Sequence, residues 1–152
     1  PLTKYSWMNI ADSEVPFLGL IEHTNMLPKE WYDGRNILYL TNYLDRTDPV
    51  YSMSQDELLD LYLPHLTKFN PEFDRSWVKK VHYNALSAAQ PIIGTNYSKA
   101  IADHRTPVKK LYLANTTQIY PEDRGTNYSI KMGRELAEMI VEDEQRGWNS
   151  WK

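Results

Sequence analysis

The sequence predicts an α+β domain, in which a mixed, mainly antiparallel sheet has a capped helix and a C-terminal helix packed on it. Two patterns point to this fold class. Short apolar segments bounded by turn residues predict strands, because a buried strand needs only about four to eight apolar residues. Apolar side chains at three- and four-residue spacing predict two helices. The chain has 152 residues and is 41% hydrophobic, which fits a single domain with its own core.

Four segments have the composition of strands: Tyr5–Ile10, Val15–His23, Asn36–Leu44 and Val78–Ala85. The third segment is continuously apolar rather than alternating, which is typical of a strand covered on both faces. It follows the second after a turn at Asp33-Gly34, so we expect the two strands to pair antiparallel.

A helix is predicted after residue 53. Ser54 and Glu57 form a capping box, in which each side chain satisfies a backbone donor at the helix start. Pro64 lacks a backbone donor, so we expect a kink or a break there. The apolar face of this helix would consist of Leu58, Leu59, Tyr62, Leu66 and Phe69.

The stretch Pro107–Ile140 predicts a short strand, a polar loop and a helix. Leu111–Ala114 is the apolar run, and the loop follows from Asn115 to Asn127. The helix start would direct free N–H groups toward the strand end, where they suit an anion or electron-rich ligand oxygens. The alternative is a plain strand-loop-helix packing unit. One thin helical face is expected from Ser129, Met132, Gly133, Leu136, Ala137 and Ile140.

Composition argues against several kinds of partner. The net charge is −3 and the basic residues are scattered, so neither nucleic acid nor an anionic membrane is favoured. The chain has no cysteine, which excludes disulfides, thiolate metal sites and a thiol nucleophile. No apolar run approaches the ~20 residues of a membrane-spanning helix.

The first residue is Pro1 rather than Met, which we interpret as a piece taken from a longer protein. Three segments match the pattern of a glycosylation acceptor, namely Asn96-Tyr97-Ser98, Asn115-Thr116-Thr117 and Asn127-Tyr128-Ser129. With no cysteine and no secretory signal in this sequence, we interpret them as chance matches and expect a cytoplasmic protein.

The sequence contains no complete catalytic motif. Glu22 and His23 could form an acid-base pair, but neighbouring residues of a strand point to opposite faces, so we expect ordinary hydrogen-bonded side chains. No two glycines are two residues apart, which excludes a Gly-x-Gly-x-x-Gly fingerprint, and the four histidines lack metal-ligand spacing. The segment Gly94–Ser98 recurs as Gly125–Ser129, either by coincidence or because two loops face one ligand.

From Leu111 to Ala137 the sequence resembles the C-terminal signature of FAD-dependent oxidoreductases of the amine oxidase, protoporphyrinogen oxidase and phytoene desaturase type. These proteins end with an apolar strand, a Gly-Asp pair, a loop and a helix of the form Ala-Val-x-Ser-Gly-x-x-Ala-Ala. Leu111–Asn115 takes the strand and pair positions, and Ser129–Ala137 takes the helix. Ala114 replaces the usual glycine, and Asn115 replaces the usual acid.

The resemblance implies a cofactor site. Asn115 would hydrogen-bond the ribityl chain of FAD, and Asn127, Tyr128 and Ser129 would present the helix start to the flavin ring. It also implies three regions: a substrate-domain-like region over residues 1–106, the flavin-contacting element over 107–147, and a tail over 148–152.

The function implied is that of the substrate-binding portion of a flavin-dependent oxidoreductase, which passes hydride from a small-molecule substrate to FAD. The N-terminal dinucleotide-binding half is missing, so we expect the fragment alone to be inactive and not to retain FAD. No catalytic residue or metal site is assigned. The expected partners are the missing FAD-binding domain or a second copy, through an exposed interdomain face. The alternatives are a non-catalytic protein- or glycan-binding domain and part of a flavin-dependent sugar mutase.

Overall fold

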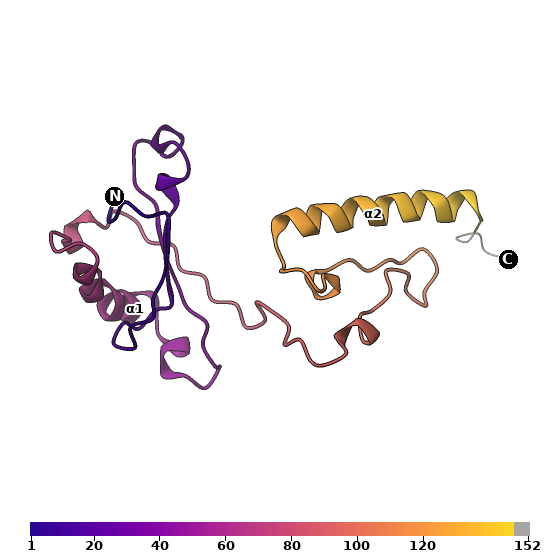
Figure 1. Ribbon diagram of the computed structural model, residues 1–152, viewed down its shortest axis with the longest axis horizontal. Helices are drawn as coiled ribbons and strands as arrows, with labels where there is room; N and C mark the ends of the chain where they lie inside the picture. The colour runs from indigo at the N-terminus through magenta and orange to yellow at the C-terminus, as the bar shows by residue number, and fades with distance from the viewer. Residues whose placement is uncertain (148–152) are drawn as a thin grey trace. The chain divides into compact units, whose positions relative to one another are not determined.

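The structure is a computed structural model that describes residues 1–147, so the predicted tail over 148–152 lies outside the described residues. The chain divides into two compact units, Pro1–Ser87 and Ala88–Lys152 (Figure 1). The boundary therefore falls at Ser87, whereas the resemblance divides the chain at residue 106. We describe each unit separately.

The first unit contains a three-stranded antiparallel sheet. Its strands are β1 (Trp7–Asn9), β2 (Gly19–Glu22) and β3 (Leu38–Thr41), in the order β1-β2-β3. The α+β class is confirmed, and so is the antiparallel pairing of the second and third predicted strands. The strands are shorter than predicted, and the sheet is wholly antiparallel rather than mixed.

Two predicted strands are wrong. The segment Val78–Ala85 forms no strand, and only its two valines are partly buried, so the segment has too little buried apolar surface to fix it against the sheet. Leu111–Ala114 contributes only an isolated antiparallel bridge between Tyr112 and Arg105. Leu111 remains 53% exposed and Leu113 37% exposed, so this apolar run is not a buried strand.

The predicted capped helix is present as α1, Gln55–Tyr62. Its capping box is complete: Glu57 N donates to Ser54 Oγ over 3.4 Å, and Ser54 N donates to Glu57 Oε2 over 2.8 Å. The expected break at Pro64 is confirmed, because the α-helix ends before it and the chain continues as a 3₁₀ helix, η4 (Leu63–Lys68).

The core of the first unit lies between one face of the sheet and the α1–η4 segment. Met8, Leu20 and Leu40 are aligned in register across the three strands, and all three contribute to this core. The predicted helix face is confirmed by Leu66, which is 1% exposed. The buried members of the core are Leu2, Val15, Phe17, Leu20, Leu63 and Leu66.

The second unit is built around the long helix α2, Thr126–Gln145 (Figure 1). Met132 and Asp143 are its buried residues, and Ile119 from the preceding loop is buried as well. The predicted helix is confirmed, but its thin face is not. Gly133 and Ala137 are exposed, because the partly buried stripe runs through Ser129, Met132, Leu136, Ile140 and Asp143 instead.

Replacing Gly133 with alanine should raise the free energy of unfolding of α2 by about 1 kcal/mol, since glycine costs that much relative to alanine in a helix interior. A Cβ built at Gly133 meets no described atom within 4 Å, so the added methyl group has room. Urea unfolding followed by circular dichroism measures the change. The matched control, Ala137→Gly on the same exposed side, should lower stability by a similar amount; a destabilising Gly133→Ala would mean that this glycine has a close neighbour.

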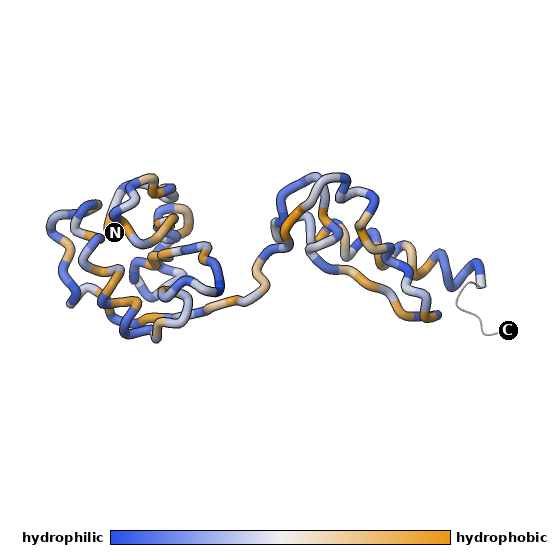
Figure 2. Tube along the Cα trace, turned by 90° about the horizontal axis from the view of Figure 1, so that it is seen from below, coloured by the Kyte–Doolittle hydropathy of each residue, from blue (hydrophilic) through white to orange (hydrophobic). Residues whose placement is uncertain are grey.

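Hydrophobic and hydrophilic residues are interspersed along both units (Figure 2). In the part of the chain that the structure describes, no helix combines the length and the apolar character needed to cross a bilayer.

Candidate functional site

The first predicted cofactor residue, Asn115, begins a short polar turn in the second unit. Its side-chain oxygen accepts a hydrogen bond from Thr117 N over 2.9 Å, and its backbone N–H donates to Gln118 Oε1 over 2.8 Å. These bonds form a capping box around the 3₁₀ turn Thr116–Gln118. Asn115 is therefore held in a fixed position, with its side chain exposed at the surface.

The other three predicted cofactor residues, Asn127, Tyr128 and Ser129, lie in the first turn of α2. Ser129 donates from its backbone N–H and from its hydroxyl to the carbonyl oxygen of Gly125, over 3.1 and 3.2 Å. Gly125 is the N-cap residue and makes no side-chain capping hydrogen bond, because glycine has no side chain. The usual cap from an N-cap side chain is therefore missing at the start of α2.

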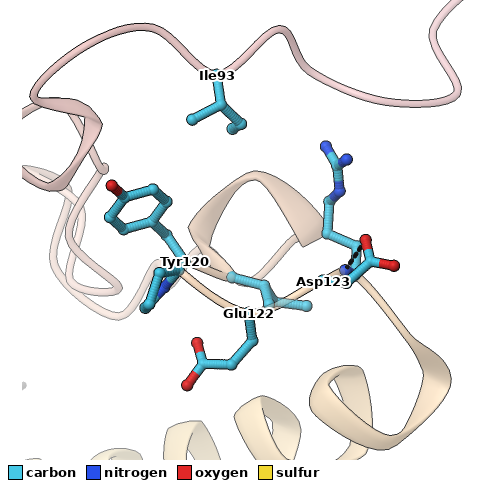
Figure 3. A pocket seen from close by; sticks show the side chains of 7 residues that line it. Ile93, Tyr120, Glu122 and Asp123 are labelled. Atoms are coloured by element: carbon cyan, nitrogen blue, oxygen red, sulfur yellow. Dashed lines mark hydrogen bonds between the residues drawn. The ribbon is translucent and has the colours of Figure 1, made fainter.

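The loop that follows Asn115 lines, together with Ile93, an open hollow of about 260 Å³, and none of the four predicted cofactor residues lines this hollow. Figure 3 shows Ile93 and Tyr120 on opposite sides of it, with Glu122 and Asp123 on the same loop as Tyr120. Arg124 also lines the hollow and donates to the carbonyl oxygen of Pro91 over 3.3 Å.

The two copies of the repeated segment have different structures. In the first copy, Asn96 has a left-handed backbone and Tyr97 begins a 3₁₀ turn, whereas the second copy enters α2. The Tyr97 ring lies 5.6 Å from the ring of Tyr120, and its hydroxyl donates to Thr117 O over 2.7 Å. Tyr97 therefore supports the loop that leads to α2.

A buried ionic cluster joins α2 to the segment before it. Arg105 donates through Nε and Nη2 to the two carboxylate oxygens of Asp143, over 2.8 and 2.9 Å, and Tyr112 adds a hydroxyl donor over 2.9 Å. The Arg105 guanidinium lowers the pKa of Asp143 below its usual range, the Tyr112 hydroxyl lowers it further, and burial opposes both. Asp143 is only 3% exposed, so this cluster is structural.

In the first unit, Glu22 and His23 lie on opposite faces, as predicted. Glu22 is buried on the core side, where its Oε1 accepts from Leu2 N over 3.0 Å. Its Oε2 has no hydrogen-bond partner within residues 1–147. His23 lies on the other side, where 2.6 Å separates its Nε2 from the hydroxyl of Tyr32.

The side of the sheet opposite the core carries exposed aromatic residues. We call this side the outer face and define it by Trp7, Asn9, Gly19, Ile21, Tyr39 and Thr41. Trp7, Ile21 and Tyr39 are aligned in register across β1, β2 and β3, and Trp7 is 61% and Tyr39 47% exposed. The expectation that β3 is covered on both faces is therefore wrong for the described chain: only its inner side chains meet the core.

Sequence reasoning missed this aromatic row and the ionic cluster. Trp7 and Tyr39 are separated by 32 positions in the sequence, and their alignment depends on strand register, which apolar composition alone does not fix. Asp143 has the sequence signature of an exposed helical acid, since no local pattern indicates Arg105 as its partner.

Comparison with known proteins assigns no class to this site: no family model matches the chain, and neither a curated protein nor a solved structure is significantly similar to it. Among residues 1–147, no three histidine, aspartate or glutamate side chains are grouped so that they could hold a metal ion.

Proposed function

We propose that this chain is the substrate-binding portion of an FAD-dependent oxidoreductase of the amine oxidase type. In this proposal a small-molecule substrate passes hydride to the flavin, and a dinucleotide-binding half outside these 152 residues holds the rest of the FAD. The observation that carries the proposal is the start of α2, where the N-cap residue is glycine and supplies no capping side chain. Free N–H groups of this kind suit the oxygens at the pyrimidine edge of a flavin.

The turn before the helix supports the same assignment. Asn115 occupies the position of the family's acid, and its capping box fixes it at the entry to the loop. Its Oδ1 already accepts from Thr117, so its side-chain NH2 group would donate to a ribityl hydroxyl without supplying charge. The residues Asn115, Asn127, Tyr128 and Ser129 therefore remain the proposed cofactor contacts of the parent protein.

The exposed outer face of the sheet supports the proposal that this chain is only one part of the enzyme. An antiparallel sheet buries one hydrophobic face and can leave the other in water, where polar side chains are the rule. In the first unit only the core side is covered by α1 and η4, and the outer face retains exposed aromatic side chains. We propose that the substrate binds over this outer face in the assembled enzyme, and that the missing FAD-binding domain closes the pocket.

In such an enzyme the flavin supplies the redox chemistry, and the protein supplies orientation and electrostatics. We assign no general acid or base. The proposal keeps the cytoplasm as the expected compartment. The proposal also includes self-association of the chain through the face that the missing domain would cover.

Titration of FAD tests the proposal in two steps. The 152-residue chain alone should bind FAD weakly or not at all, because it has no pyrophosphate-binding motif; tight stoichiometric binding would contradict this version. The protein encoded by the complete reading frame should contain FAD that bleaches with its substrate, and Asn115→Ala should weaken FAD retention there. A matched control is Asn84→Ala, an exposed asparagine outside the proposed site. A complete reading frame without a Gly-x-Gly-x-x-Gly motif would overturn the assignment.

The second candidate is a non-catalytic domain that binds a protein or a glycan. It is favoured by the aligned aromatic row on the outer face, since aromatic residues are enriched in recognition surfaces. A third candidate keeps the flavin but makes the parent protein a sugar mutase. Conversion of a sugar nucleotide by the complete protein with reduced flavin, without net oxidation, would identify a mutase.

A further inference from the structure

The aromatic side chains of the outer face are held in place before any ligand binds. Trp7 donates through Nε1 to Asn9 Oδ1 over 2.9 Å, which fixes the indole although it is 61% exposed. Tyr39 has the His23 ring against it, with centroids 5.7 Å apart, and His23 is in turn held by Tyr32. Rings with fixed orientations lose little conformational entropy when a ligand stacks on them.

The chemistry of this surface is uncharged. None of the six residues that define the outer face carries a formal charge. Beside the aromatic row lie the neutral hydrogen-bonding groups of Asn9 and Thr41, with the hydroxyl of Thr41 over Gly19. These six residues offer no counter-ion to a formally charged ligand, and a wholly apolar ligand would desolvate the side chains of Asn9 and Thr41 without giving them hydrogen bonds.

The size of the surface favours a small ligand over a protein. Strands of three or four residues, about 3.4 Å per residue and about 4.8 Å apart, give a face of roughly 150–200 Å². A stable protein interface needs about 800 Å² from each partner. One or two six-membered rings fit across the roughly 10 Å from Trp7 to Tyr39.

We infer that the outer face binds a neutral hydroxylated ring, such as a pyranose unit of a glycan. The C–H face of one sugar ring would stack on Trp7 and that of a second, linked ring on Tyr39, and their hydroxyls would reach Asn9 and Thr41. The inference rests on the proposed function in one respect: it names a sugar as the substrate class of that enzyme. Stacking of a sugar on the sheet does not itself require the flavin.

The test is titration of the 152-residue chain with the two-ring glycosides methyl cellobioside and methyl lactoside, followed by amide and indole NMR resonances. We expect saturable shifts confined to residues 7–9, 19–23 and 37–41, and weaker shifts with cellobiouronic acid, which carries a carboxylate. Trp7→Ala and Tyr39→Ala should each weaken binding by about 3- to 10-fold, the range of one aromatic contact. Tyr43→Ala is the matched control, because this tyrosine is 67% exposed and lies just beyond β3.

Three results would overturn the inference: no saturable shift with either neutral glycoside, shifts centred elsewhere, or equal losses in Tyr39→Ala and Tyr43→Ala. The wild-type shift map decides the matter even if a variant fails to fold. Loss of glycoside binding leaves the flavin assignment standing, because FAD retention by the complete protein tests that separately. Failure of FAD retention would in turn leave a measured glycoside site intact.

Discussion

Replacing Phe17 with alanine should strongly lower the free energy of unfolding of the first unit. Phe17 is 1% exposed, and its ring lies 5.3 Å from that of Tyr62 and 6.2 Å from that of Phe69. Truncation of a buried phenylalanine costs about 3–5 kcal/mol, from lost transfer free energy and from the cavity that remains. Since a unit of 87 residues has a stability of about 4–13 kcal/mol, the change removes a large part of it.

The next residue supplies the control. Leu18 is 49% exposed, so Leu18→Ala should change stability by no more than about 0.5 kcal/mol. Urea unfolding, followed by the NMR signals of β2 and β3, measures both variants under identical conditions. Similar losses in the two variants would show that the core does not depend on Phe17 as its burial implies.

Replacing Asp143 with asparagine should destabilise the second unit at neutral pH and change the pH dependence of its stability. The substitution removes the charge that pairs with Arg105 and keeps the shape of the side chain. Because Asp143 is buried, the variant leaves a partly buried guanidinium facing a neutral amide. The loss should exceed that of Glu138→Gln, an exposed acid on the same helix.

The sign of the pH effect follows from the lowered pKa of Asp143. In the folded chain the carboxylate binds its proton less readily than in the unfolded chain, where its pKa is about 3.9. Its contribution is therefore complete above about pH 5, well above the unfolded pKa, and is lost as the pH falls through the folded pKa. The stabilities of wild type and Asp143→Asn should converge in acid. Amide signals of α2 during urea unfolding at several pH values measure this; a constant difference down to acid pH would refute the assigned role.

Local sequence signals predicted most of the elements of the fold. The box at Ser54 and Glu57 located the start of α1, and Pro64 located its end, because capping and a missing donor act within a few residues. The α2 helix was predicted from its three- and four-residue spacing. The false strand at Val78–Ala85 shows the limit of such signals: β-forming residues do not make a strand unless a partner strand and a core accept them.

The candidate site was predicted only in part. The sequence indicated Asn115 and the start of α2. In the structure Asn115 begins a capped 3₁₀ turn, and α2 begins after a glycine that has no capping side chain. Gly133 and Ala137 were predicted to lie on the packed face of α2 but are exposed, since small residues are compatible with both faces of an amphipathic helix. Pairings between distant residues, such as Arg105 with Asp143, depend on tertiary packing that no local pattern encodes.

The eight-residue length of α1 has a consequence for the order of folding. Isolated helices shorter than about 12 residues are marginal in water, so the capping box alone does not hold α1 together before the sheet is present. The 20-residue α2 is long enough for transient helix in the unfolded chain. Nascent structure should therefore concentrate over Thr126–Gln145, whereas α1 would form together with β2 and β3, after the entropy of closing the loops between them has been lost.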